Sequence, residues 1–348
     1  MLLPPKIWSR TEISLFPLLL LASILVFAFL YCPAAVKAEE EPAPLAEISE
    51  PQLNLPGVRG ANATHSYISN TVERLSQRID SFFGEERIYE EATGTYIQIR
   101  GSAIFSEGGH RDYDGKFRIK VDLPQIEEKV NFVIESRDER DEEEDSDRIT
   151  SGTELNEEID DNDLSAALQF MLRQKEKWNL SIRPGIKLTS PLEAFVKFRY
   201  RNYQPLGEKW MFRGTIKAEY NTEDDWENGW EFDLERKIGA STLFRSATSL
   251  LWQQQVPGNQ LLTQVFQVNH LFNRRQSLSF EIGTTAETRP KLNDLYYFSS
   301  LRYRKDIHQG WLFLELKPQI IYRRETGWKD EPGFVVTLET LFGAKYLQ

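Results

Sequence analysis

The sequence predicts an all-β fold, an antiparallel up-and-down transmembrane β-barrel preceded by one amphipathic helix. From Gly94 onward, apolar and polar residues alternate with a period of two, as they do in strands whose two faces meet different surroundings. The candidate strands are about ten to thirteen residues long, which matches a tilted crossing of a bilayer. Aromatic residues gather near the ends of these strands, where the interfacial girdles of a membrane barrel lie.

Residues 1–38 have the features of a cleaved signal peptide for export. Lys6 and Arg10 form a positive start, an apolar stretch covers 13–31, and small residues follow as far as Ala38. The length of the apolar stretch leaves an uncleaved membrane anchor as an alternative.

Cys32 is the only cysteine of the chain, and it leaves a lipoprotein as a further alternative. Tyr31 precedes it at a position where a lipoprotein signal has a small residue. If cleavage follows Ala38, the mature chain has no thiol, which excludes disulfides, thiol catalysis and cysteine-based metal sites.

A proline-rich linker at 39–60 and an amphipathic helix within 61–86 are expected to precede the barrel at 87–348. The apolar residues of the helix recur at spacings of three and four and share one face: Ile68, Val72, Leu75, Ile79 and Phe82. Thr64 is a plausible N-cap and Gly84 a plausible residue after the C-terminus. We expect this helix to pack against the end of the barrel or to lie at the periplasmic surface, with a plug inside the lumen as the alternative.

The pattern gives about fourteen strands, with twelve as the alternative count. They are 95–105, 115–123, 129–137, 164–173, 178–189, 193–203, 209–220, 228–236, 240–252, 260–272, 277–287, 294–305, 310–323 and 333–342. Pro184 and Pro318 predict a bulge or break, because proline has no N–H for the ladder. The phase of 261–272 is ambiguous, since Gln264 and His270 share a face with apolar residues.

One acidic segment accounts for the net charge of −11. Residues 138–163 carry fourteen Asp and Glu against two Arg, so the remainder of the chain is nearly neutral. We expect a solvated outer loop, and we keep open the hypothesis that divalent cations bridge it to lipopolysaccharide phosphates. No basic patch with interleaved aromatic residues stands out, so nucleic acid is not an expected partner.

The signal segment, the alternating strands and the final Gly333–Phe342 stretch resemble those of single-chain Gram-negative outer-membrane β-barrels with a porin-like architecture. This stretch alternates apolar residues and ends on an aromatic one, although six residues follow Phe342. The resemblance implies a location in the bacterial outer membrane. It also implies contact with outer-membrane lipid and lipopolysaccharide, and insertion by the barrel-assembly machinery.

A charged set on neighbouring strands is expected to face the lumen and to set its selectivity. It comprises Arg199, Arg201, Arg213, Lys217, Glu231, Asp233 and Glu235. A basic wall facing an acidic wall would create a transverse field. Alternatively, the same residues could pair across strands and form a closed network that fills the lumen.

No catalytic constellation is expected, because the histidines lack suitably spaced partners. The signature of outer-membrane phospholipases, a histidine and a serine two residues apart, does not occur at His110 or His270. No metal or cofactor is implied. We therefore expect a passive channel or uptake barrel for small hydrophilic solutes. The alternatives are a non-conducting structural or docking barrel, whose helix plugs the lumen or binds a periplasmic partner, and a lipid-active enzyme.

Overall fold

The computed structural model describes residues 70–83, 95–123, 130–137, 163–175, 177–206, 209–223, 225–254, 260–288 and 291–343. The predicted signal peptide, the linker, the helix caps at 64 and 84 and the acidic segment up to 162 lie outside these residues.

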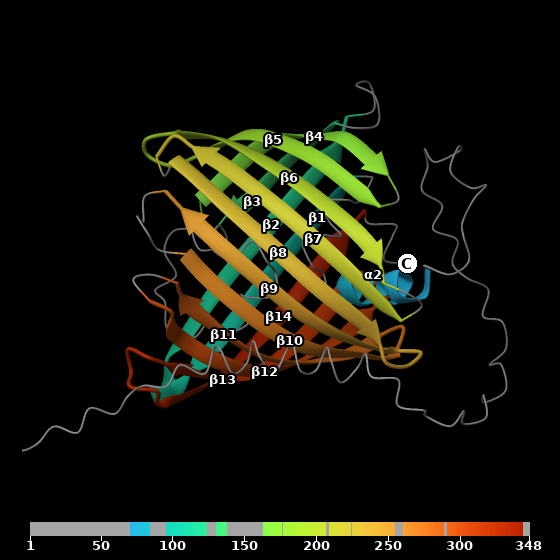
Figure 1. Cartoon of the computed structure of the whole chain (residues 1–348), viewed down its shortest axis with the longest axis vertical. Coiled ribbons are helices and arrows are strands. Elements are labelled where there is room, and N and C mark those ends of the chain that lie inside the picture. Colours follow the sequence, from blue (N-terminus) through green and yellow to red (C-terminus); the bar gives the residue numbers. More distant parts are fainter. Residues whose placement is uncertain are drawn as a thin grey trace, which may run out of the picture.

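Fourteen strands form one closed barrel, in which each strand pairs with its sequence neighbours and β1 pairs with β14 (Figure 1). The strands are β1 (Tyr96–Ser106), β2 (Arg111–Asp122), β3 (Val130–Arg137), β4 (Asp163–Lys175), β5 (Trp178–Lys187), β6 (Glu193–Pro205), β7 (Trp210–Asn221), β8 (Asp225–Lys237), β9 (Thr242–Gln253), β10 (Gln260–Asn273), β11 (Gln276–Glu287), β12 (Asn293–His308), β13 (Leu312–Arg323) and β14 (Asp330–Phe342). Fourteen strands are thus confirmed over twelve, and each strand has a hydrogen-bonded neighbour on both sides.

The barrel has two ends, which we name by their connections. The turn end carries both barrel termini and the connections at 206–209, 238–241, 274–275 and 309–311. The loop end carries the connections at 107–110, 188–192 and 324–329, and there β3 and β9 end and β4 and β10 begin. In outer-membrane barrels the short turns face the periplasm. One connection is shorter than expected, because β8 already begins at Asp225.

The alternation of the sequence becomes an apolar outer surface and a polar inner one. On β6, Val196 and Phe198 point outward and are about 40% exposed, whereas Lys197 and Arg199 point inward and are buried. A soluble β-sandwich has the opposite arrangement, with its apolar side chains inside. Outward apolar and inward charged positions are the arrangement that a membrane barrel requires.

The ambiguous strand keeps its register with β9 throughout and with β11 as far as Leu271, where a register shift follows before Asn273. On β10, Val268 and Phe272 face outward while Gln267 and Asn269 face inward. The outward polar side chains satisfy one another on the outer face: the Gln264 amide bonds to Ser246 and Thr248 on β9, and His270 Nδ1 lies 2.8 Å from the Thr242 hydroxyl.

The two prolines interrupt pairing without shifting it. Pro184 pairs in register with Val196 on β6, and Pro318 pairs in register with Phe334 on β14. On the other side of each proline, toward β4 and β12, pairs are missing from the ladder. Of the predicted bulge or break, a local break forms at each proline, because the missing N–H cannot join the ladder.

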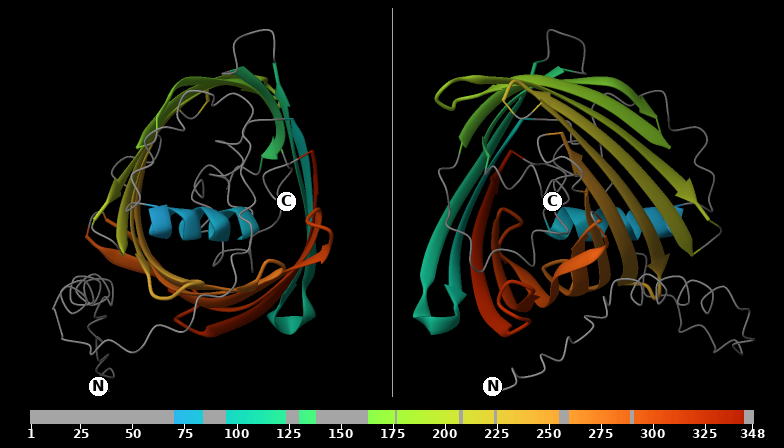
Figure 2. Two further views of the ribbon diagram at one scale, coloured as in Figure 1. Left: turned by 90° about the vertical axis from the view of Figure 1, so that its right-hand side faces the viewer. Right: turned by 60° about the vertical axis from the view of Figure 1, so that its left-hand side comes forward.

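The amphipathic helix, α2 (Asn70–Phe83), lies inside the barrel and crosses the lumen near the turn end (Figure 2). The expectation that it packs outside, against the barrel end or at the periplasmic surface, is therefore wrong. An apolar stripe indicates that a helix packs on an apolar surface but not where that surface lies. Among the described residues, no helix has the length and apolar character needed to cross a membrane.

Candidate functional site: the lumen and the helix within it

The inner wall carries charge of opposite sign on its two halves. Among the buried side chains described on β2–β7, eight are basic and three acidic. The basic ones are Lys120, Arg183, Lys187, Lys197, Arg199, Arg201, Arg213 and Lys217, and the acidic ones are Glu135, Glu193 and Glu219.

On β8–β14 the balance is reversed, with eight acidic and four basic buried side chains. The acidic ones are Asp233, Glu235, Glu281, Asp294, Asp306, Glu315, Glu331 and Glu339, and the basic ones are Arg245, Arg304, Lys317 and Arg323. The strands β4–β6 and β11–β13 lie on opposite sides of the barrel (Figure 2).

All seven residues predicted from the sequence lie on the inner wall, on β6, β7 and β8. Within this set, charges pair with their cross-strand neighbours. Arg213 pairs with Asp233 at 2.8 Å and with Glu235 at 2.9 Å, and Lys217 pairs with Glu231 at 2.8 Å.

The remaining two arginines, both on β6, stand opposite neutral or basic positions. Arg199 lies opposite Lys217 and Ser181, and Arg201 lies opposite Thr215 and Asn179. The Arg201 Nε donates a hydrogen bond to the Thr215 hydroxyl at 3.2 Å. These positions concentrate positive charge on the β6 side of the wall.

A buried ion-pair cluster fixes α2 to the wall. Asp80 is fully buried and binds two arginines, with Oδ1 at 2.5 Å from Arg245 Nη2 and Oδ2 at 3.6 Å from Arg213 Nη1. Ser76, one turn earlier, accepts a hydrogen bond from Arg245 at 3.2 Å and donates one to Asp80 at 3.3 Å. Glu235 completes the cluster by accepting a hydrogen bond from Arg245 Nε at 2.8 Å.

An apolar surface next to this cluster receives the apolar stripe of α2. The helix contributes Val72, Leu75, Ile79 and Phe83, and the wall contributes Met211, Leu243 and Leu271 from β7, β9 and β10. These three wall residues occupy inward positions, and a second apolar cluster on the same wall contains Ala247, Val265, Phe298, Ile321 and Val335. The first cluster is the one that α2 covers, and we call its three wall residues together with Arg213 and Arg245 the helix seat.

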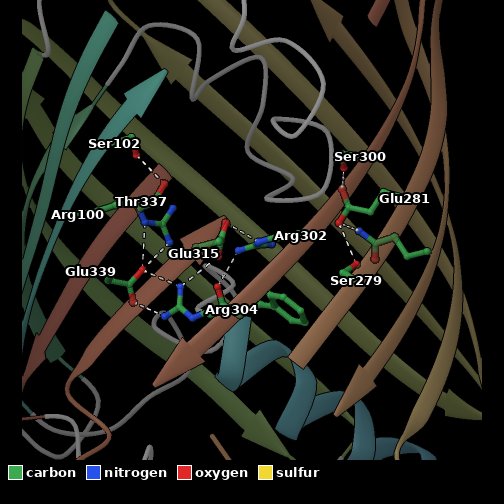
Figure 3. A network of polar contacts seen from close by, with 12 residues as sticks. Arg100, Ser102, Ser279, Glu281, Ser300, Arg302, Arg304, Glu315, Thr337 and Glu339 are labelled. Carbon is green, nitrogen blue, oxygen red and sulfur yellow. Dashed lines mark hydrogen bonds and ion pairs between the residues drawn. The ribbon is translucent and has the colours of Figure 1, made fainter. Parts of the chain in front are cut away.

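The C-terminal end of α2 reaches a second charged cluster, on the β12–β14 side (Figure 3). Arg302 donates a hydrogen bond to the Phe83 carbonyl at 2.9 Å, and its guanidinium lies 4.7 Å from the centre of the Phe83 ring. A cation at a helix C-terminus is stabilised by the free carbonyl groups there. Phe82 packs edge-on against Phe313 of β13.

Arg302 also belongs to a network of wall ion pairs. It pairs with Glu315 at 2.8 Å, and Arg304 bridges Glu315 and Glu339 at 3.5 and 2.8 Å. Arg100 of β1 adds a further pair to Glu339 at 2.9 Å. The neighbouring Glu281 accepts hydrogen bonds from neutral donors on Gln267, Ser279 and Ser300 (Figure 3).

Sequence reasoning missed Asp80, Arg245 and the charged residues of β11–β14. Their inward positions were available from the alternating pattern, since Glu315 stands between Leu314 and Leu316, and Glu339 follows Leu338 with Leu341 two residues on. What the pattern does not contain is which strands come together around the helix.

The described histidines lie away from the lumen wall contacts: His110 is exposed at the loop end, His270 faces outward, and His308 packs on Trp311 at the turn end. Within the described ranges, no group of three or more His, Cys, Asp and Glu is placed to hold a metal ion.

No protein-family model matches the chain, and no curated protein matches it by sequence. Among solved structures, the "KdgM porin" is 6% identical, with a TM-score of 0.37 over 70% of this chain and 99% of that one. The high-pH structure of OprB from Pseudomonas putida is 9% identical, with a TM-score of 0.45 over 74% and 96%. The "CymD monoaromatic hydrocarbon channel" is 5% identical, with a TM-score of 0.45 over 79% and 93%.

These likenesses are distant, and the geometry of the chain carries the assignment of its fold. The barrel is closed, its outer face is apolar, its inner wall is charged, and both of its ends in the sequence lie at the turn end. The chain forms a closed fourteen-strand β-barrel, and its apolar outer face and charged inner wall give it the porin-like architecture of a barrel that spans a membrane.

Proposed function

We propose that this chain is a passive channel for small hydrophilic solutes and that α2 restricts its turn end. The observation that carries the proposal is a charged inner wall that runs from one end of the barrel to the other. Near the loop end, Lys187 and Glu193 line it; near the turn end, Arg304 and Glu339 line it. A row of ionised groups is compatible with water along the lumen, beside the two apolar clusters that pack on the same wall.

The position of α2 supports the restriction. The helix crosses the lumen and is bound on the β7–β10 side by Asp80 and on the β12 side by Phe83. Two attachments on different sides of the barrel keep the helix body in the path along the barrel axis (Figure 2).

A non-conducting barrel is the second candidate, and the same helix favours it. A helix fixed by buried ion pairs could close the lumen permanently, and the barrel would then serve as a structural or docking element. The two candidates differ in whether releasing α2 changes ion flow.

The test is single-channel conductance of the chain from residue 39 onward in a planar bilayer, with and without an Ile79→Asp change. Ile79 is fully buried against the seat, so a carboxylate there should unseat α2 at a cost of several kcal/mol. We expect conductance to rise in this variant. Arg78→Gln, on the exposed side of the same helix, is the matched control and should leave conductance unchanged.

Silence in both the original chain and the Ile79→Asp variant would refute the channel. Equal conductance in both would retain the channel but refute a restriction by α2. Correct folding of each variant is checked by its mobility on a gel before and after heating.

A further inference from the structure

We propose that the helix seat is also a binding site for a small carboxylate with an apolar body, and that such a solute and α2 exclude one another. The inference rests on the proposed channel function, because the solute reaches the seat through the lumen. It starts from the chemistry of what occupies the seat now: one carboxylate, that of Asp80, attached to an apolar surface.

The carboxylate position is built by two guanidinium groups, each of which approaches a different oxygen of Asp80. Arg245 Nη2 lies 2.5 Å from Oδ1, and Arg213 Nη1 lies 3.6 Å from Oδ2. Both arginines are at most 1% exposed. Guanidinium groups in a dry site recognise a carboxylate by charge and by shape.

Wall carboxylates hold these guanidinium groups in position. Arg213 uses Nε for Asp233 and Nη2 for Glu235, which leaves Nη1 directed at Asp80. Arg245 uses Nε for Glu235, which leaves Nη2 directed at Asp80. Carboxylates of β8 thus position both guanidinium groups from the wall side, while Ser76 and Asp80 contact Arg245 from the helix side. The wall carboxylates are the part of this arrangement that would preorganise the site for a ligand.

The charge balance allows α2 to leave. Without the helix, Arg213 and Arg245 remain paired with Asp233 and Glu235, so the wall keeps equal numbers of positive and negative charges. Asp80 adds a third carboxylate to this buried group. Removing it leaves no uncompensated charge on the wall, and a buried unpaired charge is what makes such a separation costly.

The apolar part of the seat selects the rest of the ligand. Met211, Leu243 and Leu271 lie beside the two arginines and now contact the apolar face of α2. A ligand that replaces α2 must cover them, since exposing apolar surface to water is unfavourable. An aromatic or short aliphatic carboxylate supplies both the negative charge and the apolar body. An inorganic anion supplies only the charge, and a neutral sugar supplies neither.

Binding is tested by titrating benzoate into the full mature chain in detergent, with benzamide as the neutral probe of the same shape. Benzoate should bind about tenfold or more tightly to the Ile79→Asp variant than to the original chain, because α2 no longer competes. Adding Arg245→Gln to that variant should weaken binding roughly tenfold to a hundredfold, which is the effect of losing a charged hydrogen bond.

The matched control is Arg323→Gln in the same variant. Arg323 is another buried, inward arginine, but it lies near the loop end and pairs with Glu331 at 2.8 Å. Benzoate affinity should not change there. Benzamide binding as strongly as benzoate, or an Arg245→Gln effect no larger than that of Arg323→Gln, would overturn the site.

Mutual exclusion has its own readout. A fluorophore on an Arg78→Cys change reports whether α2 is seated, and the chain from residue 39 onward offers no other cysteine for the label. Benzoate should release the helix and benzamide should not. Benzoate bound with the helix still seated would refute exclusion. Neither measurement depends on ion conductance. A negative binding result would therefore refute the carboxylate site alone, whereas the channel proposal is refuted only if the bilayer shows no conductance.

Discussion

Gly283 shows how closely one inward position of β11 is packed. A Cβ built there would lie 2.7 Å from ring atoms of Phe298 and 2.9 Å from the carbonyl oxygen of Gln264. The first neighbour is a buried ring in an apolar cluster and the second is backbone, so neither can move away freely. The absence of a side chain at Gly283 is what lets the Phe298 ring lie flat on the wall.

Gly283→Ala should therefore destabilise the barrel by about 1–3 kcal/mol, the usual cost of overpacking a filled site. Unfolding in urea from lipid vesicles measures it. Gly101→Ala is the control, because a Cβ at Gly101 meets nothing within 4 Å. An equal loss of stability in both variants would show that strand glycines matter through the backbone and not through this contact.

Arg304 is the central residue of the ion-pair network on β12–β14. It is 1% exposed, binds Glu315 and Glu339, and covers the Phe313 ring with its guanidinium at 4.5 Å. Without Arg304, Glu315 keeps Arg302 and Glu339 keeps Arg100, but each buried carboxylate loses one of its two arginines. A hydrogen bond to a charged group contributes about 1.5–3 kcal/mol, and Arg304 makes two such contacts.

Arg304→Met should lower the free energy of unfolding by about 3–5 kcal/mol. The comparison is Arg275→Met, whose side chain is 57% exposed and pairs with Asp306 at 3.2 Å. That exposed pair should contribute no more than about 1 kcal/mol. Similar losses from the two changes would mean that water screens the Arg304 network, in which case the lumen is more open at this depth than its burial indicates.

The positions of the strands can be predicted from the sequence to a much greater extent than the position of the helix. The fourteen strands follow from a local rule, since each alternating segment specifies its own inner and outer face and the closed barrel then orders them by chain sequence. This rule also placed all seven candidate residues on the inner wall. Even β10, whose pattern is ambiguous, keeps its register because its outward polar groups find partners on β9.

The location of α2 follows from no local rule. Its apolar stripe was visible, but the surface that receives it is assembled from Met211, Leu243 and Leu271, which stand far apart in the sequence. Met211 stands among polar inward residues on β7, but Leu243 shares the inner face of β9 with Ala247, and Leu271 shares that of β10 with Val265. Only their meeting on neighbouring strands, beside Arg213 and Arg245, distinguishes a seat for a helix from three unrelated apolar positions.

On the scale of the whole barrel, the charges of the inner wall divide into two halves. Close pairs such as Lys217 with Glu231 cancel locally, but the buried charges of β2–β7 sum to a positive value and those of β8–β14 to a negative one. Strands from the two halves face one another across the lumen (Figure 2). A field across the lumen results, which draws anions toward one side and cations toward the other.

Neutralising one half at a time should therefore shift ion selectivity in opposite directions. Arg199→Gln with Arg201→Gln removes two positive charges from β6 and should favour potassium over chloride. Glu281→Gln removes a negative charge from β11 and should favour chloride. A change of a few-fold in the permeability ratio is expected, the order that ~1 kcal/mol per charge at 4 Å in water gives.

The reversal potential of the Ile79→Asp channel in a potassium chloride gradient measures both shifts in one background, with α2 unseated. Replacing both arginines by lysine keeps the charge and should leave the potential unchanged, which separates charge from shape. If both neutralised variants shift the reversal potential in the same direction, the two halves of the wall do not act on ions separately. Opposite shifts require that anions and cations pass along different sides of the barrel, which only a charge separation on the scale of the whole wall can produce.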